Sequence, residues 1–372
     1  MMNYIIWNAD PEIFTIPIPF FDTELTLRWY GLLFALGFII SQQILYYIYR
    51  KEGKPEKDVD TLTIYMVIAT ILGARLGHVI FYQPELLWTN PASVILPFEF
   101  NPTFKFTGLQ GLASHGGAIG ILLALWIYSR KKKPGQNYFQ VLDRIVILVA
   151  LTGALIRLGN FYNAEILGMP THSNYGIVFA NDISEALTRT EPVDRVSFVP
   201  VDSTANEMGY QPAKMLVEFK PDSSAQVGDL HRAARRILSF QASREHFDST
   251  EELPTKLVKD ENGVYSAIVF MYLIPRHPAQ LYESISCLLL FAFLFWRWYT
   301  KKEKLPAGQL FGIFLVVCFG LRFFYEFLKE NQVGFEEGMV LNMGQILSIP
   351  LVLAGLIILI LSNRKKTLQT PE

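Results

Sequence analysis

The stretch GALIRLGNFYNAEILG, residues 153–168, decides how the rest of the chain is interpreted. It closes an apolar run and ends in four polar residues, namely Arg157, Asn160, Asn163 and Glu165. If the run lies in a bilayer, Arg157 stands near its edge, where a guanidinium is costly unless an anion meets it. Arg157 and Asn160 share a helix face, and a fork of donors beside an amide suits a phosphate group. An interfacial arginine that snorkels to water is the alternative for Arg157 alone.

The composition indicates a membrane protein. Hydrophobic residues make up 51% of the 372 residues and charged residues 18%, with a formal net charge of -1. The apolar residues form blocks about as long as a bilayer is thick, separated by charged turns, which is typical of a polytopic protein. The near-zero charge gives no indication of a nucleic-acid partner. We interpret Cys287 and Cys318, both in apolar blocks, as buried free thiols. The acidic N-terminus is unlike a cleavable signal peptide.

We predict an all-α membrane part with seven transmembrane helices. The fourth has the weakest signal, because the strictly apolar run between Arg144 and Arg157 is short. The predicted spans cover residues 28–49, 61–82, 111–129, 139–162, 278–298, 307–328 and 343–361.

The connections predict the orientation of these spans. Basic residues concentrate in RKEGKPEK after the first span, RKKK after the third, KKEK after the fifth and NRKK after the seventh. The short connections on the other side hold almost no basic residues. The positive-inside rule then places the basic set in the cytoplasm, the N-terminus outside and the C-terminus inside.

The expected domains are an extracytoplasmic segment 1–27, helices one to four in 28–169, an extracytoplasmic domain 170–275, helices five to seven in 276–361 and a cytoplasmic tail 362–372. Segment 170–275 has strand-like runs at VSFVPVD and KMLVEF and a basic amphipathic run at LHRAARRILSF, so we predict a small α+β insert. The spacing of His172, His231 and His246 is not that of a metal site, and we expect no metal or other cofactor. The lack of an internal repeat argues against a transporter built from inverted repeats.

With this topology, polar residues gather at the outer ends of the spans. A transporter would place them near the middle of the bilayer. A set at headgroup level favours an enzyme whose substrate is a lipid. The set comprises Arg28, Trp29, Tyr30, Arg75, His78, Tyr82, Ser114, His115, Arg157, Asn160, Asn163, Arg276, His277, Gln280, Tyr282, Glu283, Arg322, Glu326, Asn342 and Gln345.

Each feature also has a purely structural interpretation. Arg322 and Glu326 are four residues apart and can form an ordinary intrahelical ion pair. The glycines around His115 permit close approach of a backbone or a substrate, but they also suit tight helix packing, as do Gly73 and Gly77. Trp29 and Tyr30 can be aromatic residues of the interfacial belt. We interpret Asp143 and Arg144, at the inner end of the fourth span, as topological and not catalytic.

Seven blocks of the sequence together resemble bacterial prolipoprotein diacylglyceryl transferases. The R-x-G-N-F-x-N block and the HGG block, in this order and topology, are the most specific. The resembling blocks are LRWYGLLFALGF, GARLGHVIFY, SHGGAIG, GALIRLGNFYNAEILG, PRHPAQLYE, LRFFYEFLK and NMGQILSIP.

The resemblance implies a reaction in the bacterial cytoplasmic (inner) membrane. The diacylglyceryl group of phosphatidylglycerol would pass to the lipobox cysteine of a prolipoprotein, giving a thioether and glycerol phosphate as the first step of lipoprotein maturation. The partners are then phosphatidylglycerol and prolipoprotein signal peptides. The matching site residues are Tyr30, His115, Arg157, Asn160, Glu165, Gly168, His277, Tyr282, Arg322 and Glu326.

Two positions and the length of one segment depart from the family pattern. Ser114 stands where a bulky aromatic residue is common, and Lys329 stands where the family often has an arginine. The segment between the fourth and fifth spans is longer than expected. These departures bear on the shape of the substrate cavity and on whether a bidentate fork is present at position 329.

As a mechanism, we expect Arg157 and Arg322 to stabilise charge on the leaving phosphate, with Asn160 in support and Glu326 holding Arg322. Our candidate for the general base that acts on the incoming thiol is His115, and Glu165 is a weaker candidate; the sequence does not settle the assignment between them. The competing functions are a lipid or small-solute transporter, a membrane scaffold for the outer domain and a different phospholipid-headgroup enzyme.

Overall fold

The computed structural model describes residues 4–17, 24–91, 94, 98–99, 105–106, 111, 113–189, 193–201, 206–207, 209–220, 247–248, 255–259, 265–330, 336 and 338–367. Its contacts divide the chain into two compact units. Unit 1 comprises Met1–Gly37, Gly153–Leu288 and Gly320–Ile349. Unit 2 comprises Phe38–Thr152, Leu289–Phe319 and Pro350–Glu372. The domain boundaries expected from the sequence stay a prediction.

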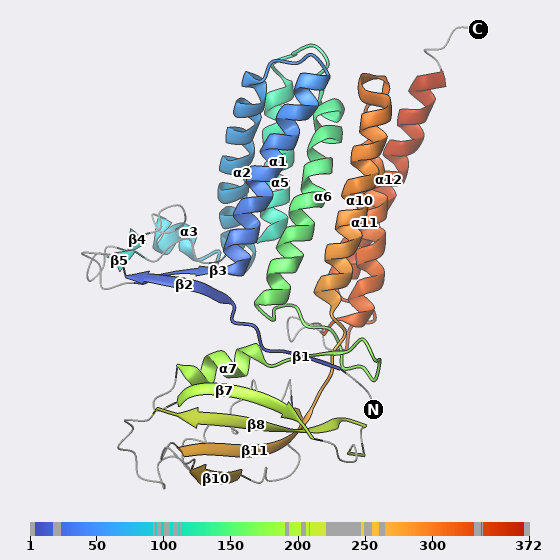
Figure 1. Cartoon of the computed structure of the whole chain (residues 1–372). Coiled ribbons are helices and arrows are strands. Elements are labelled where there is room, and N and C mark those ends of the chain that lie inside the picture. The colour runs from blue at the N-terminus through green and yellow to red at the C-terminus, as the bar shows by residue number, and fades with distance from the viewer. Residues whose placement is uncertain are drawn as a thin grey trace. The chain divides into compact units, whose positions relative to one another are not determined.

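Among the described residues, each apolar block of the sequence forms a helix (Figure 1). Six helical segments are long and apolar enough to cross a membrane, and the helix that begins at the Ser114-His115 pair is a shorter apolar one. This mostly helical structure is compatible with a polytopic membrane protein. The helices are α1 (Trp29–Lys51), α2 (Lys57–Tyr82), α5 (Ser114–Ser129), α6 (Tyr138–Tyr162), α10 (Ala279–Lys301), α11 (Gln309–Tyr325) and α12 (Met343–Thr367).

The core of unit 2 is built around α6. Buried residues run along this helix from Val141 to Leu151, and they pack with Trp298 of α10, which has 0% exposure. The Asp143 and Arg144 side chains, which shorten the apolar run of the sequence, are also buried. The Asp143 carboxylate accepts the backbone N–H groups of Gly308 (2.7 Å) and Phe311 (2.9 Å) at the start of α11. The two residues therefore have a packing role beyond the topological one that we predicted.

Glycines let α2 and α5 approach closely inside unit 2. A Cβ atom added at Gly73 would lie 2.5 Å from the Gly116 carbonyl oxygen, and one at Gly120 would lie 2.5 Å from the Ala69 oxygen. Backbone contact of this kind excludes any side chain at these positions. Tight helix packing, the structural alternative, is therefore observed for Gly73, Gly116 and Gly120, whereas close approach of a substrate beside His115 stays a prediction.

The described part of segment 170–275 in unit 1 contains a five-stranded antiparallel sheet and one short helix. The strand order is β10-β11-β8-β7, with β9 paired to β11. Strands β7 and β8 confirm the predicted strands at VSFVPVD and KMLVEF. LHRAARRILSF, His231 and His246 lie outside the described residues, whereas His172 stacks on Tyr210. The elements are α7 (Asn181–Thr188), β7 (Val193–Pro200), β8 (Gln211–Phe219), β9 (Phe247–Asp248), β10 (Thr255–Lys259) and β11 (Tyr265–Leu273).

Short strands that we did not predict also occur. In unit 1, β1 (Ile5–Trp7) pairs in parallel with β6 (Ile177–Phe179), and β2 (Glu12–Pro17) pairs antiparallel with β3 (Glu24–Arg28). Unit 2 contains the short helix α3 (Leu86–Thr89) and the pair β4 (Phe98–Glu99) and β5 (Lys105–Phe106). The β1–β6 pair ties the start of the chain to the segment that follows α6.

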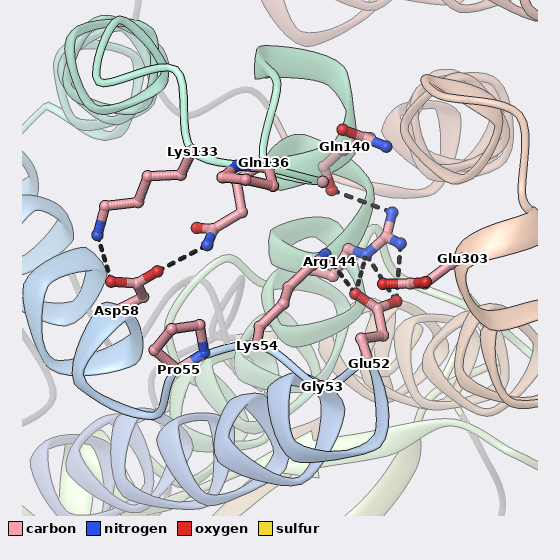
Figure 2. Close-up of a pocket in the computed structure, with 12 residues that line it drawn as sticks. Glu52, Gly53, Lys54, Pro55, Asp58, Lys133, Gln136, Gln140, Arg144 and Glu303 are labelled. Carbon is pink, nitrogen blue, oxygen red and sulfur yellow. Dashed lines mark hydrogen bonds and ion pairs between the residues drawn. The ribbon is translucent and has the colours of Figure 1, made fainter.

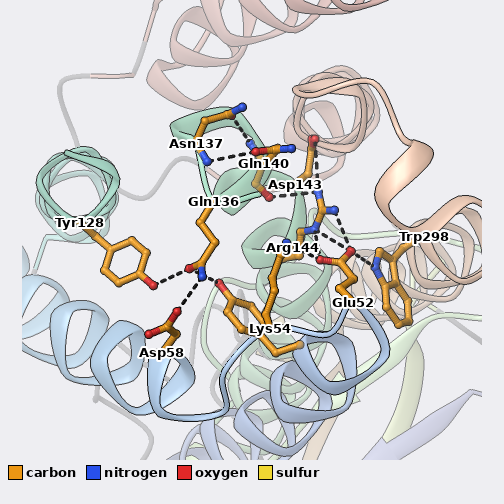
Figure 3. Close-up of polar contacts among 11 residues, drawn as sticks. Glu52, Lys54, Asp58, Tyr128, Gln136, Asn137, Gln140, Asp143, Arg144 and Trp298 are labelled. Carbon is orange, nitrogen blue, oxygen red and sulfur yellow. Dashed lines mark hydrogen bonds and ion pairs between the residues drawn. The ribbon is translucent and has the colours of Figure 1, made fainter. Parts of the chain in front are cut away.

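Three basic connections of the sequence meet in unit 2. The residues after α1, between α5 and α6, and after α10 line one polar cavity of about 760 Å³ (Figure 2). Lys133 and Gln136 donate to the Asp58 carboxylate (Figure 2). Gln136 also accepts from the Tyr128 hydroxyl at 2.5 Å (Figure 3). At the last turn of α12, Asn363 accepts from the side chain of Gln309. All four segments with basic clusters therefore contribute to the same unit.

Glu52 is the centre of this polar cluster. Its side chain is 0% exposed and accepts from Arg144 Nη2 (2.7 Å), Lys54 Nζ (2.5 Å) and Trp298 Nε1 (2.8 Å). Burial alone would raise the pKa of Glu52, but the attraction and hydrogen bonds from Arg144 and Lys54 outweigh burial and lower this pKa. Burial and repulsion by Arg144 lower the pKa of the Lys54 ammonium, so Arg144 is the principal counterion of Glu52. The carboxylate thereby joins α1, α6 and α10.

Replacing Glu52 with glutamine should destabilise the protein in a pH-dependent way. Because folding lowers the pKa of Glu52, its ionised form stabilises the fold above its unfolded pKa, and this contribution is lost as the pH falls through the folded pKa. Breaking a buried pair costs about 3–5 kcal/mol, so Glu52→Gln should clearly lower the unfolding temperature at pH 7. Below the ordinary carboxyl pKa of 4.5 the difference from the wild type should narrow. Thermal unfolding of both proteins in detergent across this range would contradict the assignment if the difference were constant.

Candidate active site

Five helix ends contribute to unit 1. They are the first turns of α1, α10 and α12 and the last turns of α6 and α11. The predicted topology places these ends outside, together with the last turn of α2 and the first turn of α5, which belong to unit 2. Most of the polar residues picked out from the sequence lie on or beside the five ends in unit 1, so their contacts can be described within one compact unit.

Arg157, on the last turns of α6, is held by two side chains. Its Nε lies 2.5 Å from Oε2 of Glu283 in α10, and its Nη1 donates to Oδ1 of Asn160 at 3.4 Å. The Arg157 side chain is 21% exposed and that of Glu283 only 8%. Within the part of the chain that the structure describes, Nη2 has no protein partner. The guanidinium is thus fixed along one edge and keeps donors at its end.

The turn after α6 orients Asn160. Its Nδ2 donates to Oε2 of Glu165 at 2.7 Å, and Nδ2 of Asn163 donates to Oε1 of the same carboxylate at 3.1 Å. Gln280 of α10 donates to the Glu165 carbonyl oxygen at 2.6 Å. Ala164 and Ile166 on either side have φ angles of 51° and 58°. Two non-glycine residues in this conformation are strained, and the hydrogen bonds to Glu165 hold the turn against that strain.

A second ionic group lies where α11 passes into the 3₁₀ turn Glu326–Leu328. Oε1 of Glu326 lies 3.4 Å from Nε of Arg322 and 3.2 Å from Nζ of Lys329, and Oε2 accepts from Nδ2 of Asn342 at 3.2 Å. A Cβ atom added at Gly344 would lie 2.5 Å from the Glu326 carboxyl carbon, so this glycine makes room for the carboxylate. The predicted pairing of Glu326 with Arg322 is confirmed.

Glu283 and Lys329 join the two groups. Nζ of Lys329 pairs with Oε1 of Glu283, the carboxylate that also holds Arg157. The result is a chain of alternating charges, Arg157–Glu283–Lys329–Glu326–Arg322, which we call the ion chain. Its members come from α6, α10 and the end of α11. Arg157 and Arg322, at the two ends of this chain, are its more exposed members.

Gly168 and His277 form a tightly packed support beside these ions. A Cβ atom at Gly168 would lie 2.1 Å from the His277 carbonyl oxygen, so no other residue fits there. The Gly168 carbonyl accepts from Nη1 of buried Arg276 at 3.0 Å. Nδ1 of His277 and the Tyr282 hydroxyl lie 3.4 Å apart. These contacts give Gly168 a packing role, whereas substrate binding by Gly168, His277 and Tyr282 stays a prediction.

Tyr30 and His115 enter from other positions. Tyr30, the second residue of α1, packs against α6, because a Cβ atom at Gly159 would lie 2.9 Å from the Tyr30 Cα atom. His115 is exposed on the first turn of α5 and belongs to unit 2. Of the predicted site residues, all except His115 thus lie in unit 1.

From the sequence alone, Glu283 is only one member of the polar set, and Lys329 is only a departure from the family pattern. Both prove central to the ion chain. The available signal was a glutamate one turn inside an apolar helix, which requires a cationic partner at such a depth. Which cation serves as that partner depends on the packing of helices that lie far apart in the sequence.

The fold and these contacts are compatible with a polytopic membrane protein that carries a cluster of paired charges at its helix ends. The sequence pattern of the prolipoprotein diacylglyceryl transferase family matches residues 17–361, and the chain belongs to this family. It is 32% identical over 367 residues to the phosphatidylglycerol–prolipoprotein diacylglyceryl transferase of Bacteroides fragilis, which covers 98% of each chain.

Two other relatives carry the same name. The protein of Tolumonas auensis is 31% identical over 362 residues, which covers 97% of this chain and 99% of the relative. That of Chloroherpeton thalassium is 30% identical over 370 residues, covering 99% and 97% respectively. The similarity therefore extends over nearly the full length of the protein, including the segment between α6 and α10.

Proposed function

We propose that the protein transfers the diacylglyceryl group of phosphatidylglycerol to the cysteine thiol of a prolipoprotein lipobox. The observation that carries this proposal is the ion chain that links Arg157 to Arg322. A phosphodiester headgroup needs cationic donors in a site of low dielectric, and two guanidiniums held by buried carboxylates meet that need. The names of the full-length relatives supply the identity of both substrates.

The site faces the extracytoplasmic leaflet of the bacterial cytoplasmic membrane in this proposal. Four segments rich in Lys and Arg contribute to unit 2, whereas the ion chain belongs to unit 1. The positive-inside rule assigns the basic segments to the cytoplasm. With seven spans, the N-terminus and the insert 170–275 lie outside and the C-terminus inside.

In the reaction, the acceptor thiol gives its proton to a general base and attacks as a thiolate. The sulfur forms a bond to the glyceryl carbon that carries the phosphate, and the carbon–oxygen bond to that phosphate breaks. The electron pair leaves with the oxygen, so glycerol phosphate departs as a monoester with an additional negative charge. Arg157 and Arg322 stabilise this charge, and Asn160 orients Arg157. Tyr30, Gly168, His277 and Tyr282 border the donor lipid.

The general base in this proposal is His115. The alternative, Glu165, already accepts hydrogen bonds from Asn160 and Asn163 through both carboxylate oxygens. A carboxylate engaged in this way is better suited to orient Asn160 than to remove a proton. An imidazole at an exposed helix start can change its protonation near neutral pH.

Reconstitution tests the function directly. The purified full-length protein, phosphatidylglycerol vesicles and a lipobox peptide should give a peptide whose mass increases by one diacylglyceryl group. A peptide with serine in place of the lipobox cysteine should give no product, because the thiol is the nucleophile. Mass spectrometry of both reactions suffices. If the folded protein left the cysteine peptide unmodified, the proposed function would be wrong.

Cysteine labelling tests the orientation. In a protein that carries Cys287→Ser and Cys318→Ser, a cysteine introduced at Lys132 should react with an impermeant maleimide only after the cells are opened. A cysteine introduced at Tyr175, which is 81% exposed, should react in spheroplasts that are still sealed. The opposite pattern of labelling would invert the topology.

Isosteric replacements separate the two candidate bases. His115→Gln should slow transfer by about 10²-fold or more, the usual contribution of a general base. Glu165→Gln keeps an oxygen that can accept from Asn160 and should cost less. Single-turnover rates measured with saturating peptide provide the comparison. A greater loss in Glu165→Gln than in His115→Gln would assign proton removal to Glu165 instead.

A further inference from the structure

Two residues of the ion chain have no role in the reaction described above. Glu283 lies on the first turns of α10, and Lys329 follows the 3₁₀ turn after α11. Their side chains are only 8% and 1% exposed. Glu283 uses Oε2 for Nε of Arg157 and Oε1 for Lys329, so a single carboxylate serves two cations.

Lys329 is fixed by its backbone as well as by its side chain. A β-bridge joins it to Gly168, and the N–H of Met169 donates to the Leu328 carbonyl oxygen at 2.8 Å. Its ammonium pairs with Glu283 on one side and with Glu326 on the other. An ammonium this deeply buried between carboxylates is not available to a bound headgroup. Burying it is costly unless both partners are present.

We propose that Glu283 and Lys329 are positioning residues for the two arginines. Glu283 sets the plane of the Arg157 guanidinium, and Lys329 couples that orientation to Arg322 through Glu326. Both arginines are held at Nε, and Nη1 of Arg157 also donates to Asn160. In this proposal the remaining Nη donors, Nη2 of Arg157 and the Nη groups of Arg322, contact the phosphate. The inference rests on the proposed function and adds the residues that make its two phosphate donors act together.

A lysine suits this place for geometric reasons. Its ammonium has three donors arranged around one atom and can contact two carboxylates that approach from different directions. The planar fork of an arginine is suited to a single carboxylate. Lysine in place of the family's arginine at position 329 therefore keeps the positive charge and the contacts with both Glu283 and Glu326. It removes a guanidinium that could compete for the phosphate.

Substitutions at the two residues should differ in their effect on the binding of the anionic lipid. Glu283→Gln removes a negative charge, so attraction of the site for phosphatidylglycerol is not weakened. The amide can still accept from Arg157 or face Lys329, but it cannot accept from both, so Arg157 loses its fixed orientation. Lys329→Met removes a positive charge and leaves two buried carboxylates facing each other, which weakens binding of an anion.

Steady-state transfer by the full-length protein, with phosphatidylglycerol varied in mixed micelles, tests this proposal. Glu283→Gln should lower kcat by at least about tenfold without raising KM for the lipid. Lys329→Met should raise KM by at least about threefold, and Lys329→Arg, which keeps the charge, should restore KM to within about threefold of the wild type. Glu56→Gln removes an exposed carboxylate that pairs with Arg50 in unit 2, and it should behave as the wild type does.

The outcomes separate this inference from the proposed function. A wild-type protein that does not transfer the lipid overturns both. If the wild type is active and Glu283→Gln has a normal kcat, the positioning role alone is overturned. The same holds if all three site variants lose kcat equally with KM unchanged, because equal losses indicate a smaller amount of folded enzyme. If Glu283→Gln does not fold, Glu283→Asp keeps the charge on a shorter side chain. It should lower kcat at unchanged KM, and a normal kcat in this variant also overturns the proposal.

Discussion

The pairing of Arg157 with Glu283 is the contact on which the rest of the site depends. An unpaired guanidinium or carboxylate near the end of a transmembrane helix is costly, and the 2.5 Å contact between Nε and Oε2 compensates both groups. It fixes α6 against α10 and determines which edge of the guanidinium stays available. The same compensation of buried charge continues along the ion chain, where each further charge is paired with an opposite one at Lys329, Glu326 and Arg322.

The two units use similar buried ions for different purposes. In unit 2, Arg144 is 3% exposed at its side chain and donates to a carboxylate with 0% exposure, so its charge is satisfied inside the protein. In unit 1, Arg157 and Arg322 are 21% and 33% exposed at their side chains. Where the cation is fully enclosed, as Arg144 is by Glu52, the ion pair serves to join helices, here α1, α6 and α10. Pairing at one edge of a cation leaves donors for a ligand, and this difference is the reason for assigning the proposed chemistry to unit 1.

Several glycines among the described residues are explained by the atoms that a side chain would meet there. Gly73 and Gly116 bring two helix backbones together. Gly168 lies against the His277 carbonyl, and Gly344 leaves space for the carboxylate of Glu326. The last two support the ion chain without carrying charge. This explains how residues with no chemistry of their own can be needed at such a site.

The helices follow from the amino-acid sequence alone, because blocks of apolar residues as long as a bilayer is thick have few other structures available. The sequence also predicted β7 and β8 from their residue pattern and the pairing of Glu326 with Arg322 from a spacing of four on one helix. The pairing of Glu283 with Arg157, and the place of Lys329 between two carboxylates, became known only from the folded structure. The folded structure alone showed that β1 pairs with β6 and that Asp143 accepts from the start of α11. The spacing of apolar and polar residues along the sequence indicates which side chains share one face of a helix or strand. Ion pairs between distant segments depend on how helices pack, and the sequence carries that information only through the folded chain as a whole.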